Sequence, residues 1–331
     1  MFRDFDLDFD KTKKVFKYKS IEEAYEDFKK VFTFNDDLFF YNGLVQNLKI
    51  NKFILAQKGE DVKAEDLLIG INLGSITLPF IIVTDYFNPS MLAISCPFVE
   101  FSEVHDIYND YMIKSGLNLQ PISESAYFPL LKKPSKEECP DFRSWLSTCK
   151  QKYYSHFFGE KSHKISWTLN HWGSDVSYKI MADTHSCHIQ HNESYMDRYA
   201  KGSEFIHNLI NVSPWCGYNP DFCWLIAGKD IEIDKYVGAM YVYIVGKRAY
   251  LHNIACSKDE KYKPYGLVLA AHYAAIRTLF FDPKFDIDII DLGCNMDDCM
   301  NYKDSMRPIK HPWLNIDIFS NFNELKGLLN G

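Results

Sequence analysis

The hydrophobic and polar positions of the first third of the chain predict a helix followed by strands. Residues 20–32 open with a serine, place acidic side chains in the first turn and lysines in the last, and therefore predict an amphipathic helix. Three apolar runs rich in Ile, Leu, Val and Phe follow, and runs of this length and composition predict strands. They lie at residues 52–57, 67–73 and 76–84. A further helix is predicted at residues 101–115, where Gly116 ends the pattern.

A segment rich in proline and charge, at residues 132–141, interrupts this pattern and predicts a boundary between two domains, residues 1–140 and 141–331. A basic, aromatic helix is predicted directly after it, at residues 142–158. The remaining predicted elements are strands at residues 179–190, 222–228, 236–245, 249–256 and 285–292, and helices at residues 193–210 and 265–281. The order of elements predicts an α+β (mixed α/β) fold of two domains, each with a mostly antiparallel mixed sheet flanked by helices.

Composition and charge narrow the class of protein. Of the 331 residues, 47% are hydrophobic and 16% aromatic, which is enough for a sizeable core and excludes a disordered chain. The formal net charge of −7 argues against non-specific nucleic-acid binding. Nine scattered cysteines without a CxxC pair indicate reduced thiols. Because neither a signal-peptide pattern nor an uncharged apolar run of about twenty residues is present, we expect a cytoplasmic protein.

The segment between the strand at 249–256 and the long helix at 265–281 has the pattern of an anion site. The first turn of a helix offers N–H groups without intrahelical partners and a partial positive charge, which suits a phosphate or pyrophosphate. Gly266 allows a ligand to approach the backbone closely, and Lys263 adds a positive charge. Pro264 lies where a missing N–H costs little.

Residues 262–268, YKPYGLV, resemble the donor-binding loop of the GNAT acyltransferases, which reads Arg/Gln-x-x-Gly-x-Gly/Ala after a strand. Lys263 stands at the Arg/Gln position and Gly266 at the first Gly, whereas Val268 departs from the second small position. A branched side chain there crowds the approach of a coenzyme A pyrophosphate.

A wider resemblance is to the tandem-domain branch of this superfamily that includes the Fem-type aminoacyltransferases. Residues 144–152 are similar to a helix that follows the N-terminal half in that branch, although its arginines are missing. Residues 291–293 (Asp-Leu-Gly) and 302–303 (Tyr-Lys) are similar to segments that follow its last strand. The resemblance covers residues 20–320 loosely, and it implies two GNAT-like domains with the donor site in the second.

The resemblance implies that an acyl-CoA or a phosphopantetheine-linked acyl donor lies between the strands at 249–256 and 285–292. The residues expected to bind it are Ile254, Cys256, Tyr262, Lys263, Tyr265, Gly266 and Leu267. His252 is expected to act as general base, since an imidazole titrates near neutral pH. Tyr302 is expected to protonate the leaving thiolate, and Asp291 to orient the amine or the Tyr302 segment. A structural role for His252, a packing role for Tyr302 and a loop-capping role for Asp291 stay open.

Three functions are compatible with this pattern. The first is an N-acyltransferase that moves an acyl group from a thioester to the amine of a small molecule or amino acid. The second is an aminoacyl-tRNA-dependent amide ligase, and the third is a non-catalytic GNAT-like binding protein. Basic residues interleaved with aromatics at residues 150–164 are compatible with an acidic acyl carrier protein or, less strongly, tRNA as a partner, although a solvated helix face explains them better. We expect no membrane partner.

His185, His188 and His191 are spaced as H-x-x-H-x-x-H and raise the question of a zinc site. On a strand, positions three apart face opposite sides, and on a helix the third histidine drifts away from the first. A polar connection between two elements therefore explains them better, and no metal is expected.

Overall fold

The chain divides into two compact units. The computed structural model describes residues 7–31, 37–56, 61–84, 92–96, 102–114, 120–121, 127–150, 157–158, 163–172, 176–177, 179–180, 184, 223–257, 259–293, 302–312 and 314–315. The first unit comprises Met1–Glu124, Val212–Tyr218 and Trp313–Gly331, and the second comprises Ser125–Asn211 and Asn219–Pro312. The compact units thus change over between Glu124 and Ser125. The sequence placed the domain boundary at residues 140 and 141, and that boundary stays a prediction.

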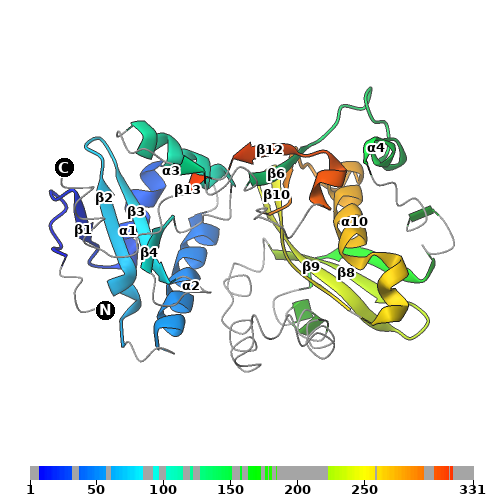
Figure 1. Ribbon diagram of the computed structural model, residues 1–331, viewed down its shortest axis with the longest axis horizontal. Helices are drawn as coiled ribbons and strands as arrows, with labels where there is room; N and C mark the ends of the chain where they lie inside the picture. Colours follow the sequence, from blue (N-terminus) through cyan, green and yellow to red (C-terminus); the bar gives the residue numbers. More distant parts are fainter. Residues whose placement is uncertain are drawn as a thin grey trace. The chain divides into compact units, whose positions relative to one another are not determined.

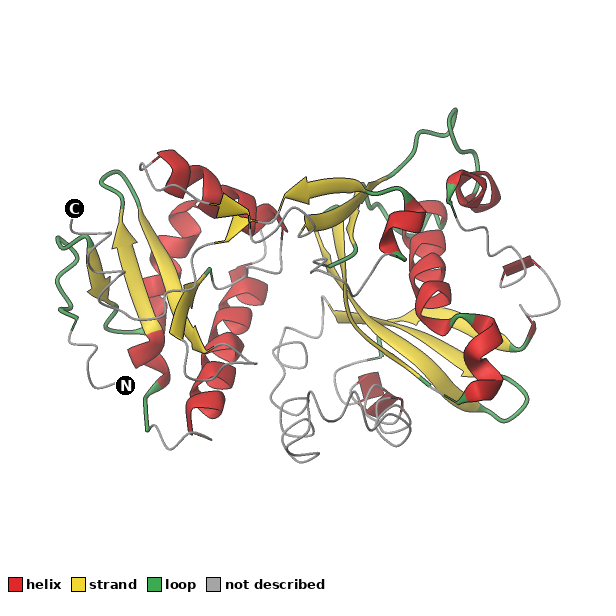
Figure 2. Ribbon diagram, viewed as in Figure 1, coloured by secondary structure: helices red, strands yellow, loops and turns green. Residues whose placement is uncertain are grey.

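The first unit is a four-stranded antiparallel sheet with helices packed against it (Figures 1 and 2). Its strands, in spatial order, are β1 (Val15–Lys17), β2 (Leu68–Asn72), β3 (Thr77–Thr84) and β4 (Leu92–Ser95). Its helices are α1 (Ile21–Val31), α2 (Asp37–Ala56), the 3₁₀ helix η2 (Ala64–Leu67) and α3 (Ser102–Lys114). Helices α1 and α2 pack against β3. The hydroxyl of Tyr108 on α3 donates to the carbonyl of Pro79 on β3, at 2.6 Å. A two-stranded ladder of β5 (Gln120–Pro121) and β13 (Leu314–Asn315) completes the unit.

The strand predicted at residues 52–57 is wrong, because residues 52–56 form the end of helix α2. The buried side chains Phe40, Leu44 and Leu48 recur every four residues along it, which is the spacing of one face of a helix. The short run around residue 54 contains only the apolar end of this helix, and taken alone it resembles a strand.

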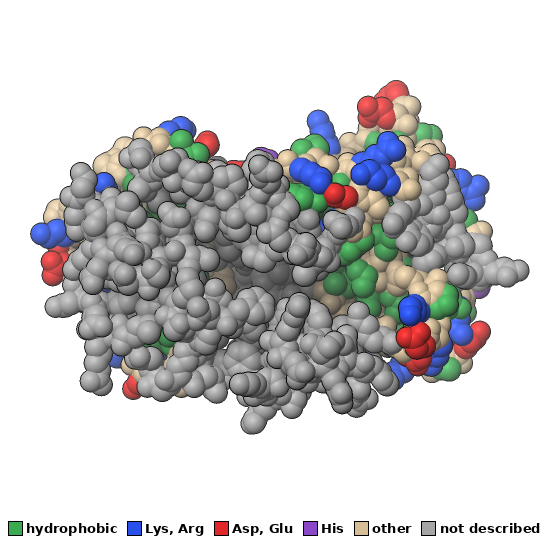
Figure 3. All heavy atoms as spheres, viewed as in Figure 1, with side chains coloured by type: hydrophobic (Ala, Val, Ile, Leu, Met, Phe, Trp, Pro, Cys, Tyr) green, Lys and Arg blue, Asp and Glu red, His purple; other side chains and the backbone are tan. Residues whose placement is uncertain are grey.

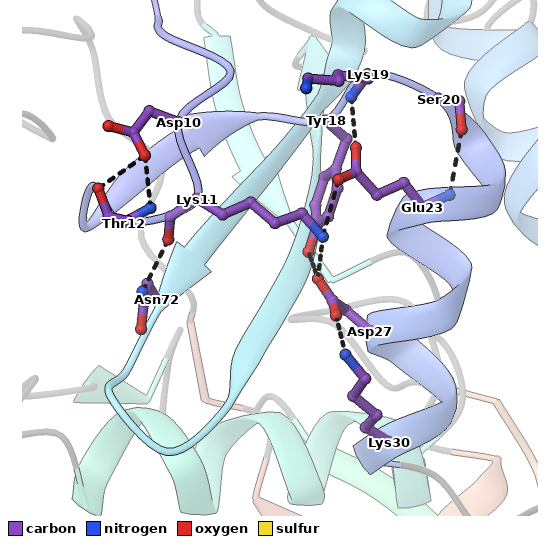
Figure 4. Close-up of polar contacts among 10 residues, drawn as sticks. All are labelled: Asp10, Lys11, Thr12, Tyr18, Lys19, Ser20, Glu23, Asp27, Lys30 and Asn72. Carbon is purple, nitrogen blue, oxygen red and sulfur yellow. Dashed lines mark hydrogen bonds and ion pairs between the residues drawn. The ribbon is translucent and has the colours of Figure 1, made fainter.

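A buried carboxylate joins the N-terminal segment to α1 (Figure 4). Asp27, which is 5% exposed, accepts hydrogen bonds from the Lys11 ammonium and the Tyr18 hydroxyl on Oδ2, both at 3.1 Å. Its Oδ1 accepts from the Lys30 ammonium at 2.7 Å. Lys11 also pairs with Glu23 at 3.0 Å. The cluster fixes the chain before β1 against α1, and we call it the Asp27 cluster.

The second unit is a seven-stranded mixed sheet crossed by one long helix, α10. In spatial order its strands are β12 (Ile309–Pro312), β6 (Tyr127–Lys132), β11 (Ile289–Asp291), β10 (Arg248–Cys256), β9 (Lys235–Val245), β8 (Cys223–Asp230) and β7 (Ile165–Asn170). Among the described residues, the helices whose bounds are defined are α4 (Phe142–Thr148), η5 (Glu260–Tyr265), α10 (Leu267–Phe281) and η6 (Lys303–Met306). All strand pairs are antiparallel except β10 with β11, which are parallel and are joined through α10. The predicted α+β class, with mostly antiparallel mixed sheets flanked by helices, is confirmed.

Helix α10 packs across β7, β8, β9 and β10, and its side chains are buried on nearly every face, as its sequence indicates. Trp167 occupies the same layer. Its indole lies over the backbone of Gly228 and Gly238, where an added Cβ would come within 2.8 Å of the ring. Gly238 stands opposite Cys256 in the ladder. The two glycines therefore make the space for the indole beneath α10.

Several predicted elements of the second unit differ from the structure. Lys179, Ile180 and Thr184 are helical, so the strand predicted at residues 179–190 is wrong where the chain is described. Helix α4 stops at Thr148, earlier than predicted, and β11 is shorter than the predicted strand. Strands β6 and β12 were not predicted. The helix predicted at residues 193–210 lies outside the described residues.

In the described part of the chain, no helix combines the length and the hydropathy required to cross a membrane.

Candidate active site

Among the described residues, the pairing between the two parallel strands of the second unit ends before β10 does. Strands β10 and β11 pair from Arg248 with Ile289 to Tyr250 with Asp291, and no further. On its other side β10 continues to pair with β9 as far as Cys256. Among the described residues, the β10 backbone beyond Tyr250 therefore has no strand partner on the β11 side. Unpaired strand edges offer N–H and C=O groups to a ligand.

A bulge lies in the middle of this free edge. The register between β10 and β9 shifts between His252 and Ile254. Bulges re-aim side chains and interrupt pairing, and they are frequent next to active sites. His252 stands opposite Tyr241 on β9, but its side chain lies outside the described part of the structure. Ile254 is half-buried beside the core.

A buried hydrogen bond fixes the loop after β10 to the end of β8. The hydroxyl of Tyr262 in η5 donates to Oδ2 of Asp230 at 2.7 Å, and both side chains are buried. Asp259 caps η5 by accepting from the N–H of Lys261 at 3.1 Å. The Tyr262 hydroxyl is thus used to anchor η5 to the end of β8. Tyr265 packs partly buried against the same core.

The start of α10 has the geometry of an anion site. Gly266 is left-handed, with φ 52° and ψ 52°, and ends η5 where α10 begins. Its carbonyl accepts the N–H of Ala270 at 2.9 Å. The N–H groups of Leu267, Val268 and Leu269 lie in the first turn of the helix, and among the described residues they donate to no backbone carbonyl. The side chain of Leu267 is buried in the core.

Lys263 is exposed and is paired with a neighbouring carboxylate. Its ammonium lies 3.5 Å from Glu260 in the same 3₁₀ helix, and both side chains are largely exposed. Figure 3 shows basic and acidic side chains next to each other over this part of the second unit. The positive charge expected at the donor loop is therefore partly compensated by Glu260.

A polar cluster that the sequence did not predict lies one turn into α10. His272 is buried, and its Nδ1 is 2.8 Å from the carbonyl oxygen of Val268. The Tyr302 hydroxyl lies 3.5 Å from Nε2 of His272, and the two rings meet edge to face. Burial, assisted by the positive charge of Lys303, lowers the pKa of His272 to about 4, although the hydrogen bond to Val268 acts in the raising direction. The imidazole is therefore neutral near pH 7.

Tyr302 connects this histidine with the end of β10. Burial, and then the neighbouring Cys256, raise the pKa of Tyr302 well above its ordinary value. The structure thus brings together two residues that the sequence singled out, Tyr302 and Cys256, and adds His272. A histidine within an otherwise apolar helix was the available signal, because a buried imidazole requires polar partners.

The Asp-Leu-Gly segment ends β11 and closes the cluster from the other side. Asp291 is fully buried, and its Oδ1 accepts the N–H of Gly293 at 2.9 Å. Gly293 has a φ of 75°, and an added Cβ would lie 3.2 Å from the carbonyl oxygen of Leu251. The buried Lys303 ammonium donates to the Gly293 carbonyl at 3.0 Å. Asp291 therefore caps the loop, which was its open alternative.

No group of three or more His, Cys, Asp or Glu side chains with the arrangement of a metal site occurs among the described residues. His185, His188 and His191 lie outside them.

Comparison with known proteins gives distant structural likenesses. No family model matches the chain, and no curated protein matches it. A conserved protein of unknown function from Bacteroides thetaiotaomicron has a TM-score of 0.41 and 12% identity, covering 89% of this chain and 96% of the other. A tandem GNAT protein from the clavulanic acid biosynthesis pathway has a TM-score of 0.37 and 8% identity, covering 85% and 93%. The C-terminal domain of a lysylphosphatidylglycerol synthetase from Agrobacterium fabrum, named as putative, has a TM-score of 0.34 and 8% identity, covering 81% and 90%. Because these TM-scores are low, any function proposed for this chain has to be argued from its own residues.

Proposed function

We propose that this chain is a GNAT-like acyltransferase that moves an acyl group from a thioester donor to the amine of a small molecule or amino acid. One observation carries the proposal. Among the described residues, the pairing of β10 with β11 ends at Tyr250, the first N–H groups of α10 make no backbone hydrogen bond, and Tyr302 lies close to Cys256 at the end of β10. A donor that has amides at one end and a pyrophosphate at the other would match the β10 backbone with its amides and the first N–H groups of α10 with its phosphates.

The free edge of β10 and the start of α10 would divide the donor between them. The pantetheine amides would pair with the β10 backbone in the manner of an added strand. The N–H groups of Leu267, Val268 and Leu269 would bind a phosphate, helped by the helix dipole. Val268 is half-buried and narrows the approach, so a phosphopantetheine arm on a carrier, with one phosphate, fits this loop better than a full pyrophosphate does.

Acyl transfer then requires the amine to attack the thioester carbonyl and the sulfur to leave with a proton. Tyr302 is the group that we assign to proton transfer at the sulfur, because it lies next to Cys256 at the end of the free edge. Burial keeps its hydroxyl protonated at neutral pH. Asp291 and Lys303 hold the loop that shapes this end of the site. A general-base role for His252 stays a prediction.

Turnover and donor binding test the proposal. Purified protein would be incubated with acyl-CoA and acyl-carrier panels and a panel of amines, while release of free thiol is followed. We expect turnover with at least one donor, and a loss of about 100-fold or more in kcat for Tyr302→Phe, since general acid–base catalysis contributes about that much. Thr278→Val is the matched control, because it removes a side-chain bond of α10 to Ala274 at 3.0 Å away from the opening. Absence both of turnover and of thermal stabilisation by any donor would refute the proposal.

A second candidate, aminoacyl-tRNA as donor, is favoured by the cations around η6. The N–H of Lys150 donates to the Ser305 carbonyl at 2.7 Å, which places this exposed lysine beside η6. Arg307 is exposed at the end of η6, and Lys310 pairs with Asp304 at 2.7 Å. An acidic carrier would use the same charges. Ribonuclease treatment separates the two, because it abolishes activity in a lysate only if the donor is a tRNA.

A further inference from the structure

The hydrogen positions in the His272–Tyr302 pair follow from the acceptor that His272 meets on its other side. A carbonyl oxygen only accepts, so Nδ1 of His272 must carry the hydrogen that is donated to Val268, at 2.8 Å. A neutral imidazole then has a lone pair at Nε2. The contact of 3.5 Å to Tyr302 is therefore one in which the tyrosine hydroxyl donates and the histidine accepts.

We propose that His272 is a positioning residue that holds the hydroxyl hydrogen of Tyr302, so that Tyr302 presents its oxygen lone pairs to the acceptor amine. The inference rests on the proposed function, because it assigns the amine to the site of a thioester donor. It changes the role expected of Tyr302. Before reaction the tyrosine binds an N–H of the amine as an acceptor, and it donates a proton only later.

The burial of the cluster explains why the two residues need each other. A tyrosinate is disfavoured at Tyr302, since burial and Cys256 raise its pKa, and an imidazolium is disfavoured at His272, whose pKa is lowered by burial and by Lys303. Both groups therefore stay neutral, and His272 takes part as the acceptor of the hydrogen bond from the Tyr302 hydroxyl.

The step balances without any further reactant. The amine nitrogen bonds to the thioester carbonyl carbon, and the carbon–sulfur bond breaks with its electron pair on sulfur. In this step Tyr302 gives its hydroxyl hydrogen to the sulfur and takes the proton of the amine on its oxygen. The products are an amide and a thiol, and both side chains return to their starting states.

The first part of the test measures the hydrogen positions without any substrate. The full chain, labelled with ¹⁵N-histidine, would be examined by NMR at pH 7, with His272 assigned by His272→Gln. We expect a protonated Nδ1 and an unprotonated Nε2, and Tyr302→Phe should shift the Nε2 resonance and leave Nδ1 in place. A protonated Nε2, or an Nε2 resonance that does not respond to Tyr302→Phe, would overturn the proposal.

The second part measures the role in turnover. Gln retains an acceptor at the position of Nε2 and Leu does not, so we expect His272→Gln to keep more kcat than His272→Leu, which should fall about 100-fold. In the Tyr302→Phe background, neither substitution should lower kcat further, because both act through the same oxygen. Additive losses, or equal loss in Gln and Leu variants that remain folded, would overturn the positioning role. An inactive wild-type protein with the expected NMR pattern would instead overturn the proposed function and leave the hydrogen assignment standing.

Discussion

Removing the charge of Asp27 should loosen the first unit in a way that depends on pH. The substitution Asp27→Asn keeps an oxygen for the buried Tyr18 hydroxyl but removes the carboxylate that Lys11 and Lys30 share (Figure 4). Lys30 is 71% exposed and Lys11 is 39% exposed, so solvent weakens both ion pairs. Hydrogen bonds to a buried charge are nevertheless stronger than exposed pairs, and we expect a loss of about 1–2 kcal/mol.

A larger change should follow from Asp27→Ala. It removes the acceptor of Tyr18 as well, and the hydroxyl of this fully buried ring is then left unsatisfied. An orphaned buried hydroxyl costs roughly 1–3 kcal/mol more. The order of stability is therefore wild type, then Asn, then Ala.

The pH dependence of Asp27→Asn follows from the direction of its pKa shift. Burial raises the pKa of Asp27, but hydrogen bonds from Lys30 and Lys11 outweigh it, so the folded pKa lies below its ordinary value. A carboxyl group with a lowered pKa stabilises the fold fully above its unfolded pKa of about 4. As the pH falls through the folded pKa, that contribution is lost. The difference between wild type and Asp27→Asn should therefore be present at pH 7 and shrink below about pH 4.

Hydrogen exchange with mass spectrometry on peptides from residues 7–31 measures this locally, which a two-unit chain requires. A loss of 1.4 kcal/mol corresponds to about tenfold faster exchange through local opening. Glu26→Gln is the matched control, since Glu26 pairs with Lys29 at 2.7 Å on the same helix but is 66% exposed. Its effect should stay within about 0.5 kcal/mol. Equal exchange in the two variants at pH 7, or a difference that grows at pH 3, would refute the reasoning.

Three further predictions concern the second unit. Gly238→Ala should lower the free energy of unfolding of this unit by about 1–3 kcal/mol in calorimetry, because the new Cβ would lie 2.8 Å from the Trp167 ring. In a Trp167→Leu background the same substitution should cost much less, and an equal cost in both backgrounds would contradict this explanation. Tyr262→Phe should cost roughly 1–3 kcal/mol by leaving buried Asp230 without its 2.7 Å donor, and an unchanged melting temperature would count against that anchor. Gly266→Ala should cost about 1–2 kcal/mol because of its left-handed backbone, and a more stable variant would show that the turn is not as described.

Local patterns predicted those elements whose partners are close in sequence. The strands predicted at residues 67–73 and 76–84 correspond to the adjacent pair β2 and β3. Strand β6, in contrast, pairs with residues 289–291 and 309–312, far along the chain, and contains Pro129. Pairing with a distant segment produces no periodic pattern of hydrophobic residues in β6 or β12, so an analysis of periodicity could not predict these two strands.

The candidate site shows the same limit in its chemistry. The loop residues were predicted because a helix start after a strand has a recognisable pattern, and their role as a donor site stays a prediction. His272 was missed because, in a helix that is apolar on nearly every face, a histidine reads as one more packed side chain. Only the folded structure shows that the hydroxyl of Tyr302, thirty residues later in the chain, lies next to Nε2 of His272. A polar cluster formed by residues this far apart in the sequence can be located only from the folded structure.

The end of the pairing between β10 and β11 is shaped by residues that carried the resemblance after the last strand. Asp291 turns its carboxylate back to the N–H of Gly293, and this bond competes with continuation of β11. The left-handed backbone of Gly293 then redirects the chain while passing close to the Leu251 carbonyl, where a side chain would crowd it. Lys303 secures the redirected segment through the Gly293 carbonyl. The end of the β10–β11 pairing is therefore a consequence of the Asp-Leu-Gly sequence, and Asp291 acts on the site by ending a strand.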